Sequence, residues 1–144
     1  MNPPPATKAP KPIRYVLLAA CALAWAGAFV ATHLPPDGVP DLHTSDKVAH
    51  AIGYGGLTTL LVLALASLGW PRGARILLAM GILLAYGALD ELTQPAFLRT
   101  ASFYDWLADA AGTSIAVAFW ETLLAVLSSA RERRFQARSR INDK

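Results

Sequence analysis

Charge is scarce in this chain, and its absence is concentrated in long blocks. Only 16% of the 144 residues are charged while 54% are hydrophobic, whereas an ordinary soluble domain carries about 25% charged residues. Positions 15–32 contain no charged residue, and positions 48–68 contain no Asp, Glu, Lys or Arg and one histidine, His50. Apolar runs of about 18 residues or more are long enough to cross the hydrocarbon core of a bilayer. The composition therefore predicts a membrane protein rather than a soluble globular domain.

Proline is missing from the middle of the apolar blocks, and so is any sustained alternation of apolar and polar residues. All ten prolines lie outside the middle parts of four segments, at about 13–33, 46–69, 74–94 and 103–128. Proline would break the internal hydrogen bonds of a helix, and a β-barrel would need alternating strands. We therefore predict an all-α fold, a polytopic membrane helix bundle with four transmembrane helices in a domain spanning residues 13–128.

Cysteine is nearly absent, and the two ends of the chain lack long apolar runs. The single Cys21 has no disulfide partner within these residues, so we interpret it as a small packing residue of the first span. Residues 1–12 include five prolines and predict a disordered cytoplasmic lead, followed by an uncleaved first helix. Residues 129–144 form a basic cytoplasmic tail. Because no nucleic-acid-binding motif accompanies its arginines, we expect it to contact the anionic leaflet of the membrane, and no nucleic acid.

Basic residues are distributed unevenly among the predicted loops and tails. If the N-terminus is cytoplasmic, 11 of the 13 Lys and Arg residues lie on the cytoplasmic side, and only Lys47 and Arg99 lie outside. The 11 are Lys8, Lys11, Arg14, Arg72, Arg75, Arg131, Arg133, Arg134, Arg138, Arg140 and Lys144. Positively charged loops stay on the cytoplasmic side. We therefore predict an N-in/C-in orientation.

The same orientation collects most acidic residues on the outer side. Seven of the ten lie there: Asp37, Asp41, Asp46, Asp90, Glu91, Asp105 and Asp109. Fourteen residues separate Arg75 from Asp90, a helical rise of about 21 Å, which is less than the roughly 30 Å of a hydrocarbon core. Asp90 and Glu91 are therefore expected within the membrane. The 11 residues between Asp109 and Glu121 predict a similarly deep Asp109.

Helical spacing groups the outer polar residues into three faces. These faces comprise Asp46, His50 and Tyr54 in the second helix, Tyr86, Asp90 and Gln94 with Glu91 beside them in the third, and Asp105, Asp109 and Gly112 in the fourth. Glycine at position 112 would let two helices approach closely. Because charges inside a membrane usually face a protein interior or a wet cavity, the three faces predict one shared site that opens outward.

The same residues also have structural interpretations. Asp46 and Asp105 suit helix N-termini, and the spacing from Ser102 to Asp105 matches a capping box. Asp90 and Glu91 stand at a helix C-terminus, where the dipole disfavours anions, so we do not expect them to be capping residues. Pairing with one of the two outer cations is their structural alternative.

Three segments of the chain together resemble the VanZ-like family of small bacterial membrane proteins. The segments are DKVAHAIGY at 46–54, DELTQ at 90–94 followed by Arg99, and DWLADAAG at 105–112, and the resemblance covers about residues 45–118. Two features differ from the family pattern, namely Asp109 in place of a common Asn and Pro95 directly after Gln94. The resemblance implies a multi-pass protein of the bacterial cytoplasmic (inner) membrane that acts on the cell envelope. The namesake of the family is associated with resistance to teicoplanin, a lipid-bearing glycopeptide antibiotic.

The polar residues at the membrane edge suggest a site for the head group of an envelope lipid or a lipidated wall component. Candidate catalytic groups are His50, oriented by Asp46, together with Glu91 and Asp90. Candidate binding residues are Asp46, Lys47, Tyr54, Gln94, Arg99, Asp105 and Asp109, with the two cations suited to hold an anion. The carboxylates are compatible with a hard cation such as Mg²⁺, but no spacing requires a metal, and the sequence identifies no cofactor.

Two other functions compete with a head-group site. In the first, the protein is a non-catalytic membrane scaffold or partner-binding subunit whose polar cluster fixes helix packing. In the second, it is a transporter, which is disfavoured because the polar residues gather at one end and only Glu121 lies in the inner half. Neither HExxH nor GxSxG occurs in the chain, so the intramembrane hydrolase motifs are missing, and the sequence leaves open whether the protein is an enzyme.

Overall fold

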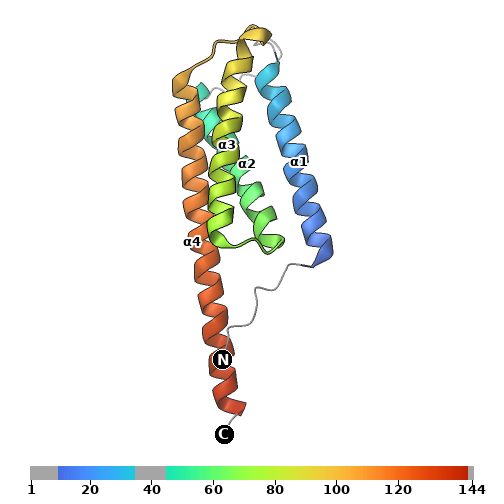
Figure 1. The fold of residues 1–144 in the computed structure, drawn as a ribbon, viewed down its shortest axis with the longest axis vertical. Helices are drawn as coiled ribbons and strands as arrows, with labels where there is room; N and C mark the ends of the chain where they lie inside the picture. The colour runs from blue at the N-terminus through green and yellow to red at the C-terminus, as the bar shows by residue number, and fades with distance from the viewer. Residues whose placement is uncertain (1–9, 35–44, 143–144) are drawn as a thin grey trace.

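The computed structural model describes residues 10–34 and 45–142, and these residues form four long α-helices and one short 3₁₀ helix (Figure 1). In chain order the elements are α1 (Lys11–His33), α2 (Asp46–Ser67), α3 (Arg72–Thr93), η2 (Gln94–Phe97) and α4 (Phe103–Asn142). The predicted all-α fold is confirmed. Most of the proline-rich lead, together with Asp37 and Asp41, lies outside the described residues.

Local sequence signals explain where the helices begin and end. Pro12 stands in the first turn of α1, where its missing N–H is not needed, and the side chain of Ser45 caps α2 by accepting from the Val48 N–H at 3.4 Å. After α2, Gly69 adopts a φ of 84°, which glycine reaches without a Cβ clash. The N–H groups of Gly69 and Trp70 then bond to carbonyls of the last turn, which forms a Schellman ending.

The helices run up and down beside one another, so each end of the bundle collects two helix starts and two helix ends (Figure 1). Helix α4 packs along α2 and α3, and α1 packs mainly against α2. Two small apolar clusters fill the centre. One is built on Tyr54, Leu57 and Leu83, and the other on Val62, Ala79 and Val117.

Close approach of α2 and α4 depends on Gly112, as its position in the sequence predicted. A Cβ atom at Gly112 would overlap the carbonyl oxygen of Ala51 and would lie 2.8 Å from the Ala51 carbonyl carbon. On the other side of the contact, a Cβ at Gly55 would lie 3.5 Å from the carbonyl oxygen of Gly112. Backbones this close bring the polar side chains at the beginnings of α2 and α4 within bonding distance.

Helices α1 and α4 are the least enclosed. In α1 only His33 is buried.

Helix α4 contains 40 residues, a length of about 60 Å, and it extends well past the other three helices (Figure 1). The predicted fourth segment ended at residue 128, whereas the helix continues into the basic tail. The reason is compositional, because residues 129–142 contain Ala, Arg, Glu and Gln but no Pro or Gly.

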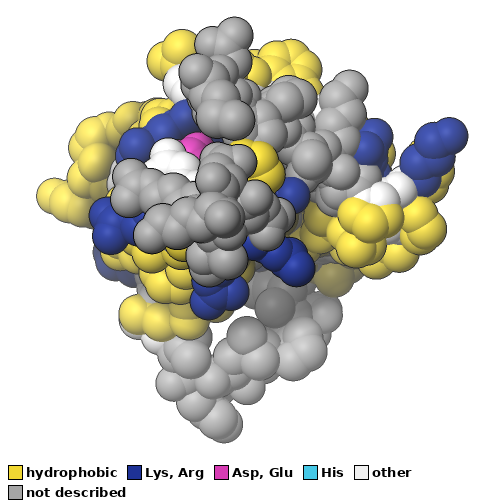
Figure 2. Space-filling model, turned by 90° about the horizontal axis from the view of Figure 1, so that it is seen from below, with side chains coloured by type: hydrophobic (Ala, Val, Ile, Leu, Met, Phe, Trp, Pro, Cys, Tyr) yellow, Lys and Arg dark blue, Asp and Glu magenta, His cyan; other side chains and the backbone are white. Residues whose placement is uncertain are grey.

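All four α-helices are long and apolar enough to cross a bilayer, so the chain is a multi-pass integral membrane protein. Figure 2 views the bundle from the end at which α4 projects, and Lys and Arg side chains (dark blue) gather there. We call this the basic end; its residues come from the starts of α1 and α3 and from the extension of α4. The charge asymmetry agrees with the predicted N-in/C-in orientation, which stays a prediction.

Candidate functional site

We call the opposite end of the bundle the polar end. There α1 and α3 end, and α2 and α4 begin. Its buried polar side chains are His33, His50, Asp90, Glu91, Gln94, Asp105 and Asp109. They come from all four α-helices and from η2. Because ionisable groups buried in a membrane bundle are costly and usually serve a function, the polar end is the candidate site.

His50 forms its shortest contact with Asp109. The distance from His50 Nδ1 to Asp109 Oδ1 is 2.9 Å, whereas His50 Nε2 lies 4.0 Å from Asp46 Oδ1. Spacing predicted that Asp46 orients His50; the structure places Asp46 near Nε2 and adds the shorter contact with Asp109 on Nδ1. Asp46 is at the exposed beginning of α2, while the Gly112 contact presses α4 against α2 and presents Asp109 to the imidazole. A carboxylate that accepts from Nδ1 leaves Nε2 as the basic nitrogen of His50.

Glu91 joins the end of α3 to the start of α4. Its Oε2 accepts the backbone N–H of Ser102 at 2.7 Å, and its Oε1 accepts from Gln94 Nε2 at 3.2 Å. The sequence analysis had excluded capping for Glu91 because it lies at a helix C-terminus. That exclusion is wrong, because η2 and the following turn fold the chain back and bring the first residues of α4 to Glu91. A carboxylate at this position also complements the dipole of α4.

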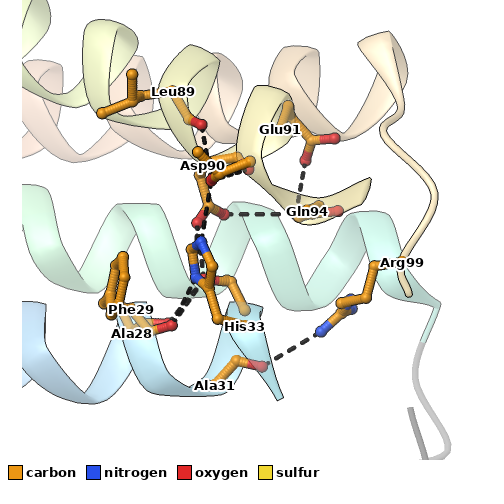
Figure 3. Close-up of polar contacts among 11 residues, drawn as sticks. Ala28, Phe29, Ala31, His33, Leu89, Asp90, Glu91, Gln94 and Arg99 are labelled. Atoms are coloured by element: carbon orange, nitrogen blue, oxygen red, sulfur yellow. Dashed lines mark hydrogen bonds and ion pairs between the residues drawn. The ribbon is translucent and has the colours of Figure 1, made fainter. Parts of the chain in front are cut away.

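Asp90 is held from α1 (Figure 3). Thr32 Oγ1 donates to Asp90 Oδ1 at 2.7 Å, His33 Nδ1 lies 3.7 Å from the same oxygen, and His33 Nε2 is 2.9 Å from Thr93 Oγ1. The sequence analysis overlooked Thr32 and His33. The sequence did contain a signal for them. Thr32 and His33 are the last polar pair of the first apolar run, and a four-span topology places them at the same end as the other polar residues.

Gln94 contacts both carboxylates at the end of α3, Asp90 and Glu91. Besides its bond to Glu91, its Nε2 lies 3.5 Å from Asp90 Oδ2. Asp90 and Gln94 therefore share one face of α3, as predicted. Asp90 contacts α1, whereas the neighbouring Glu91 contacts the start of α4. Residues of the three predicted faces lie close together, and the contact of Asp90 adds α1 to them.

The two cations of the polar end lie at its rim. Lys47 Nζ is 3.5 Å from Asp105 Oδ1, and Arg99 is 4.0 Å from Asp46 Oδ1 while also donating to the Ala31 carbonyl at 3.2 Å. Among the described residues, no ion pair joins either cation to Asp90, Glu91 or Asp109. The structural alternative predicted for Asp90 and Glu91, pairing with these cations, is thus not found there.

Two tyrosines line the site below the carboxylates. The rings of His50 and Tyr54 are stacked with centroids 6.5 Å apart, and those of Tyr54 and Tyr86 are 5.9 Å apart. Within the described part of the chain, neither tyrosine hydroxyl has a hydrogen-bond partner, and Asp109 Oδ2 also has none. Buried polar atoms usually have partners; among the described residues, Asp105 Oδ1 and Trp25 Nε1 also have no hydrogen-bond partner.

The sequence indicated that the carboxylates are compatible with a hard cation, and the structure brings two sets of possible metal ligands together. His50, Glu91 and Asp109 each offer one ligand atom, and these atoms lie within 4.8 Å of one another; Asp46, His50 and Asp105 form a second such set. The three members of the first set come from α2, α3 and α4, and all are buried.

An open, mostly apolar groove of about 410 Å³ runs between the end of α3 and the start of α4. Its lining residues are Ala88, Glu91, Leu92, Ala101, Ser102, Phe103 and Trp106. We call it the α3–α4 groove. Since Glu91 is part of its lining, the groove gives the Glu91 carboxylate a lateral opening among mostly apolar side chains.

At the basic end, Glu121 is fully paired. Arg75 binds it with two parallel hydrogen bonds, from Nε to Oε1 at 2.7 Å and from the second guanidinium nitrogen to Oε2 at 2.6 Å. Bidentate pairs of this kind are the strongest ion pairs in proteins. From the sequence, Glu121 was an isolated carboxylate in the inner half of the membrane. In the structure, the pair with Arg75 holds α4 against the start of α3.

Comparisons of the chain with protein-family models, with curated proteins and with solved structures find no match. The VanZ-like resemblance therefore depends on the motif residues quoted above.

Proposed function

We propose that this chain is a VanZ-like protein of the bacterial cytoplasmic membrane whose polar end binds or modifies the head group of an envelope lipid or lipidated cell-wall component. The observation that carries the proposal is the buried His50–Asp109 pair, at 2.9 Å, in a bundle of membrane-spanning helices where it also comes close to Glu91. Such a site lies at the ends of the spanning helices, which is the level at which lipid head groups are found.

The arrangement suits a phosphate-bearing or otherwise anionic head group. Lys47 and Arg99 at the rim supply positive charge, and Lys and Arg are the usual ligands of such anions. Behind them, His50 has a basic Nε2 if Asp109 accepts its Nδ1 proton. Glu91 stands at the inner edge, where a carboxyl group could exchange a proton with a bound ligand.

The α3–α4 groove supports a lipid in particular. Phe103 and Trp106 contribute apolar surface to it, and Glu91 lies in its wall. A lipid could therefore place an acyl chain along the groove while its head group reaches the polar end. If the resemblance extends to physiology, the bound component would be one through which the protein influences sensitivity to teicoplanin-type glycopeptides.

A non-catalytic scaffold is the second candidate, and a specific observation favours it. The Glu91–Ser102 and Thr32–Asp90 hydrogen bonds each join two helices, at 2.7 Å in both cases. These bonds would hold the helix ends together even if nothing were bound there.

Lipid mass spectrometry of the purified protein separates the two candidates. We expect one lipid class to co-purify with the wild-type protein and to be depleted at least several-fold in Glu91→Gln and His50→Ala, with membrane abundance unchanged. Glu132→Gln, which alters an exposed carboxylate on the extension of α4, is the control and should keep the wild-type lipids. Identical lipid profiles in all four proteins would refute the head-group site. Loss of abundance in Glu91→Gln would favour the scaffold.

A further inference from the structure

We propose that His50, Glu91 and Asp109 together bind one divalent transition-metal ion, Zn²⁺ or Mn²⁺. These residues project from three different helices, and one ligand atom of each lies within 4.8 Å of the others. All three are more than nine-tenths buried, with exposed fractions of 8%, 6% and 0%.

The local charge favours a bound cation. Four carboxylates are buried at the polar end, namely Asp90, Glu91, Asp105 and Asp109. Among the described residues, Lys47 pairs with only one of them, Asp105, and Arg99 pairs with the exposed Asp46. Buried charges are generally paired or bound to a metal. A divalent ion between Glu91 and Asp109 would provide the positive charge that the rim cations do not.

A second, independent observation is the unsatisfied oxygen of Asp109. Within the described residues Asp109 Oδ2 has no hydrogen-bond partner, although the residue is completely buried. The oxygen is aimed at α3, because a Cβ atom at Gly87 would lie 3.0 Å from it. Gly87 is one helical turn before Glu91 and shares its face. Asp109 Oδ2 therefore points toward the helix face that carries the other carboxylate ligand.

The distances are close to those of a metal site. Zinc bonds to nitrogen and oxygen of about 2.0–2.2 Å place the ligand atoms of a tetrahedral site roughly 3.4 Å apart. The separation of His50 Nδ1 and Asp109 Oδ1 is 2.9 Å, so the metal would take the place of the hydrogen between them. The neutral imidazole would then carry its proton on Nε2, and in the metal-bound state His50 is a ligand rather than a base. The ligand atom of Glu91 lies at most 4.8 Å from the other two. Rotation of its side chain would therefore need to bring it closer by at most about 1.4 Å to reach the separation in a tetrahedral site.

The ligand types select the metal and leave a place for a ligand. One imidazole with two carboxylates suits Zn²⁺ or Mn²⁺ better than Mg²⁺ or Ca²⁺, which prefer oxygen ligands only. Three protein ligands leave at least one coordination position for water or for an oxygen of a head group. This inference deepens the proposed function and rests on it for the role of the metal. Metal binding itself is measured without lipid, so the two proposals can fail separately.

Metal content of the full chain tests the inference. The protein is purified in detergent with an affinity tag that contains no histidine, stripped with a chelator and titrated with Zn²⁺ and with Mn²⁺, and the bound metal is counted by mass spectrometry. We expect one ion per chain for the wild type. Glu91→Gln and Asp109→Asn should bind at least about 100-fold more weakly, since even the loss of an outer-shell partner costs 10–100-fold.

Glu132→Gln, which alters an exposed carboxylate on the extension of α4, is the matched control and should bind as tightly as the wild type. Asp46→Asn distinguishes the two sets, because Asp46 belongs to the second set with His50 and Asp105. Loss of binding in Asp46→Asn with retention in Glu91→Gln would overturn the assignment, as would a wild-type protein that holds much less than one ion per chain.

Cobalt replacement of the metal keeps the test independent of how the variants fold. Co²⁺ bound by nitrogen and oxygen ligands in a four-coordinate site should give the wild-type chain visible absorption bands that saturate at one equivalent and disappear when Zn²⁺ is added. A wild-type chain that takes up Co²⁺ without saturation, or without such bands, contradicts the proposed site.

Discussion

Gly112 shows how one residue positions the site. It allows the backbone of α4 to contact that of α2 at Ala51, and this contact carries Asp109, three residues earlier in α4, to within 2.9 Å of His50. A side chain at position 112 would separate the two helices, since the obstructing atoms belong to the Ala51 backbone and cannot rotate away. The polar contacts between α2 and α4 therefore depend on the absence of a Cβ atom.

Gly112→Ala should destabilise the protein by about 1–3 kcal/mol or more, the usual range for overpacking. The midpoint of thermal unfolding in detergent, followed by tryptophan fluorescence, measures the effect. Gly56→Ala in α2 is the matched control, because nothing lies within 4 Å of a Cβ at that position. A Gly112→Ala variant as stable as Gly56→Ala would show that the two helices are not so close.

Some hydrogen bonds, such as that between Thr58 and Thr113, join helix faces, but several polar ties between elements lie at helix ends. Glu91 ties α3 to the start of α4, Thr32 ties α1 to α3, and Arg75 ties the start of α3 to the middle of α4. We infer that these hydrogen-bonded pairs fix how far the helices slide along one another.

Arg75→Met should be strongly destabilising, by about 3–5 kcal/mol, because it leaves the buried Glu121 charge without its bidentate partner. The control is Arg72→Met, whose guanidinium is largely exposed and 3.8 Å from Glu121. Its loss should cost less than about 1 kcal/mol. Thermal unfolding of the purified proteins compares the two.

The double variant Arg75→Met with Glu121→Leu should recover much of the stability, because apolar replacement of both members of a buried ion pair is often neutral or stabilising. A double variant as unstable as Arg75→Met alone would show that the arginine acts through its bond to the Trp70 carbonyl at 2.7 Å rather than through Glu121.

The whole molecule is electrically polarised along its long axis. Carboxylates and histidines are concentrated at the polar end, while Lys and Arg gather at the basic end and along the extension of α4 (Figure 2). Positively charged segments stay on the cytoplasmic side of a membrane. We therefore expect the basic end in the cytoplasm and the polar end outside.

Cysteine labelling in intact cells tests this orientation. In a Cys21→Ser background, Thr100→Cys in the turn before α4 should react with a membrane-impermeant maleimide. Trp70→Cys, which lies between α2 and α3, should react only after the membrane is permeabilised. Both positions are exposed, so the difference reports on sidedness rather than on burial. The reverse labelling pattern would invert the orientation and place the polar end in the cytoplasm.

Composition and spacing alone determined the architecture. Long uncharged runs and the placement of proline predicted four membrane helices with beginnings and ends within two residues of those observed, except at the end of α4. Helical spacing also identified most of the polar-end residues, because side chains four positions apart share a helix face whatever the helix packs against. The extension of α4 was not predicted because hydropathy identifies only the apolar part of a helix. The residues of the extension are polar but still have high helix propensity.

Which side chains meet was decided only by the tertiary structure. Spacing predicted Asp46 as the partner of His50, and the structure adds a closer partner, Asp109, which the Gly112 contact presents. Glu91 was excluded as a cap from its place in α3, yet the turn after η2 brings the Ser102 N–H to it. The topology places Thr32 and His33 at the same end of the bundle as Asp90, but only the packing of α1 against α3 shows that they contact it. Sequence periodicity describes one helix at a time, whereas contacts between helices depend on how closely their backbones approach, and at the polar end that distance is set by a glycine.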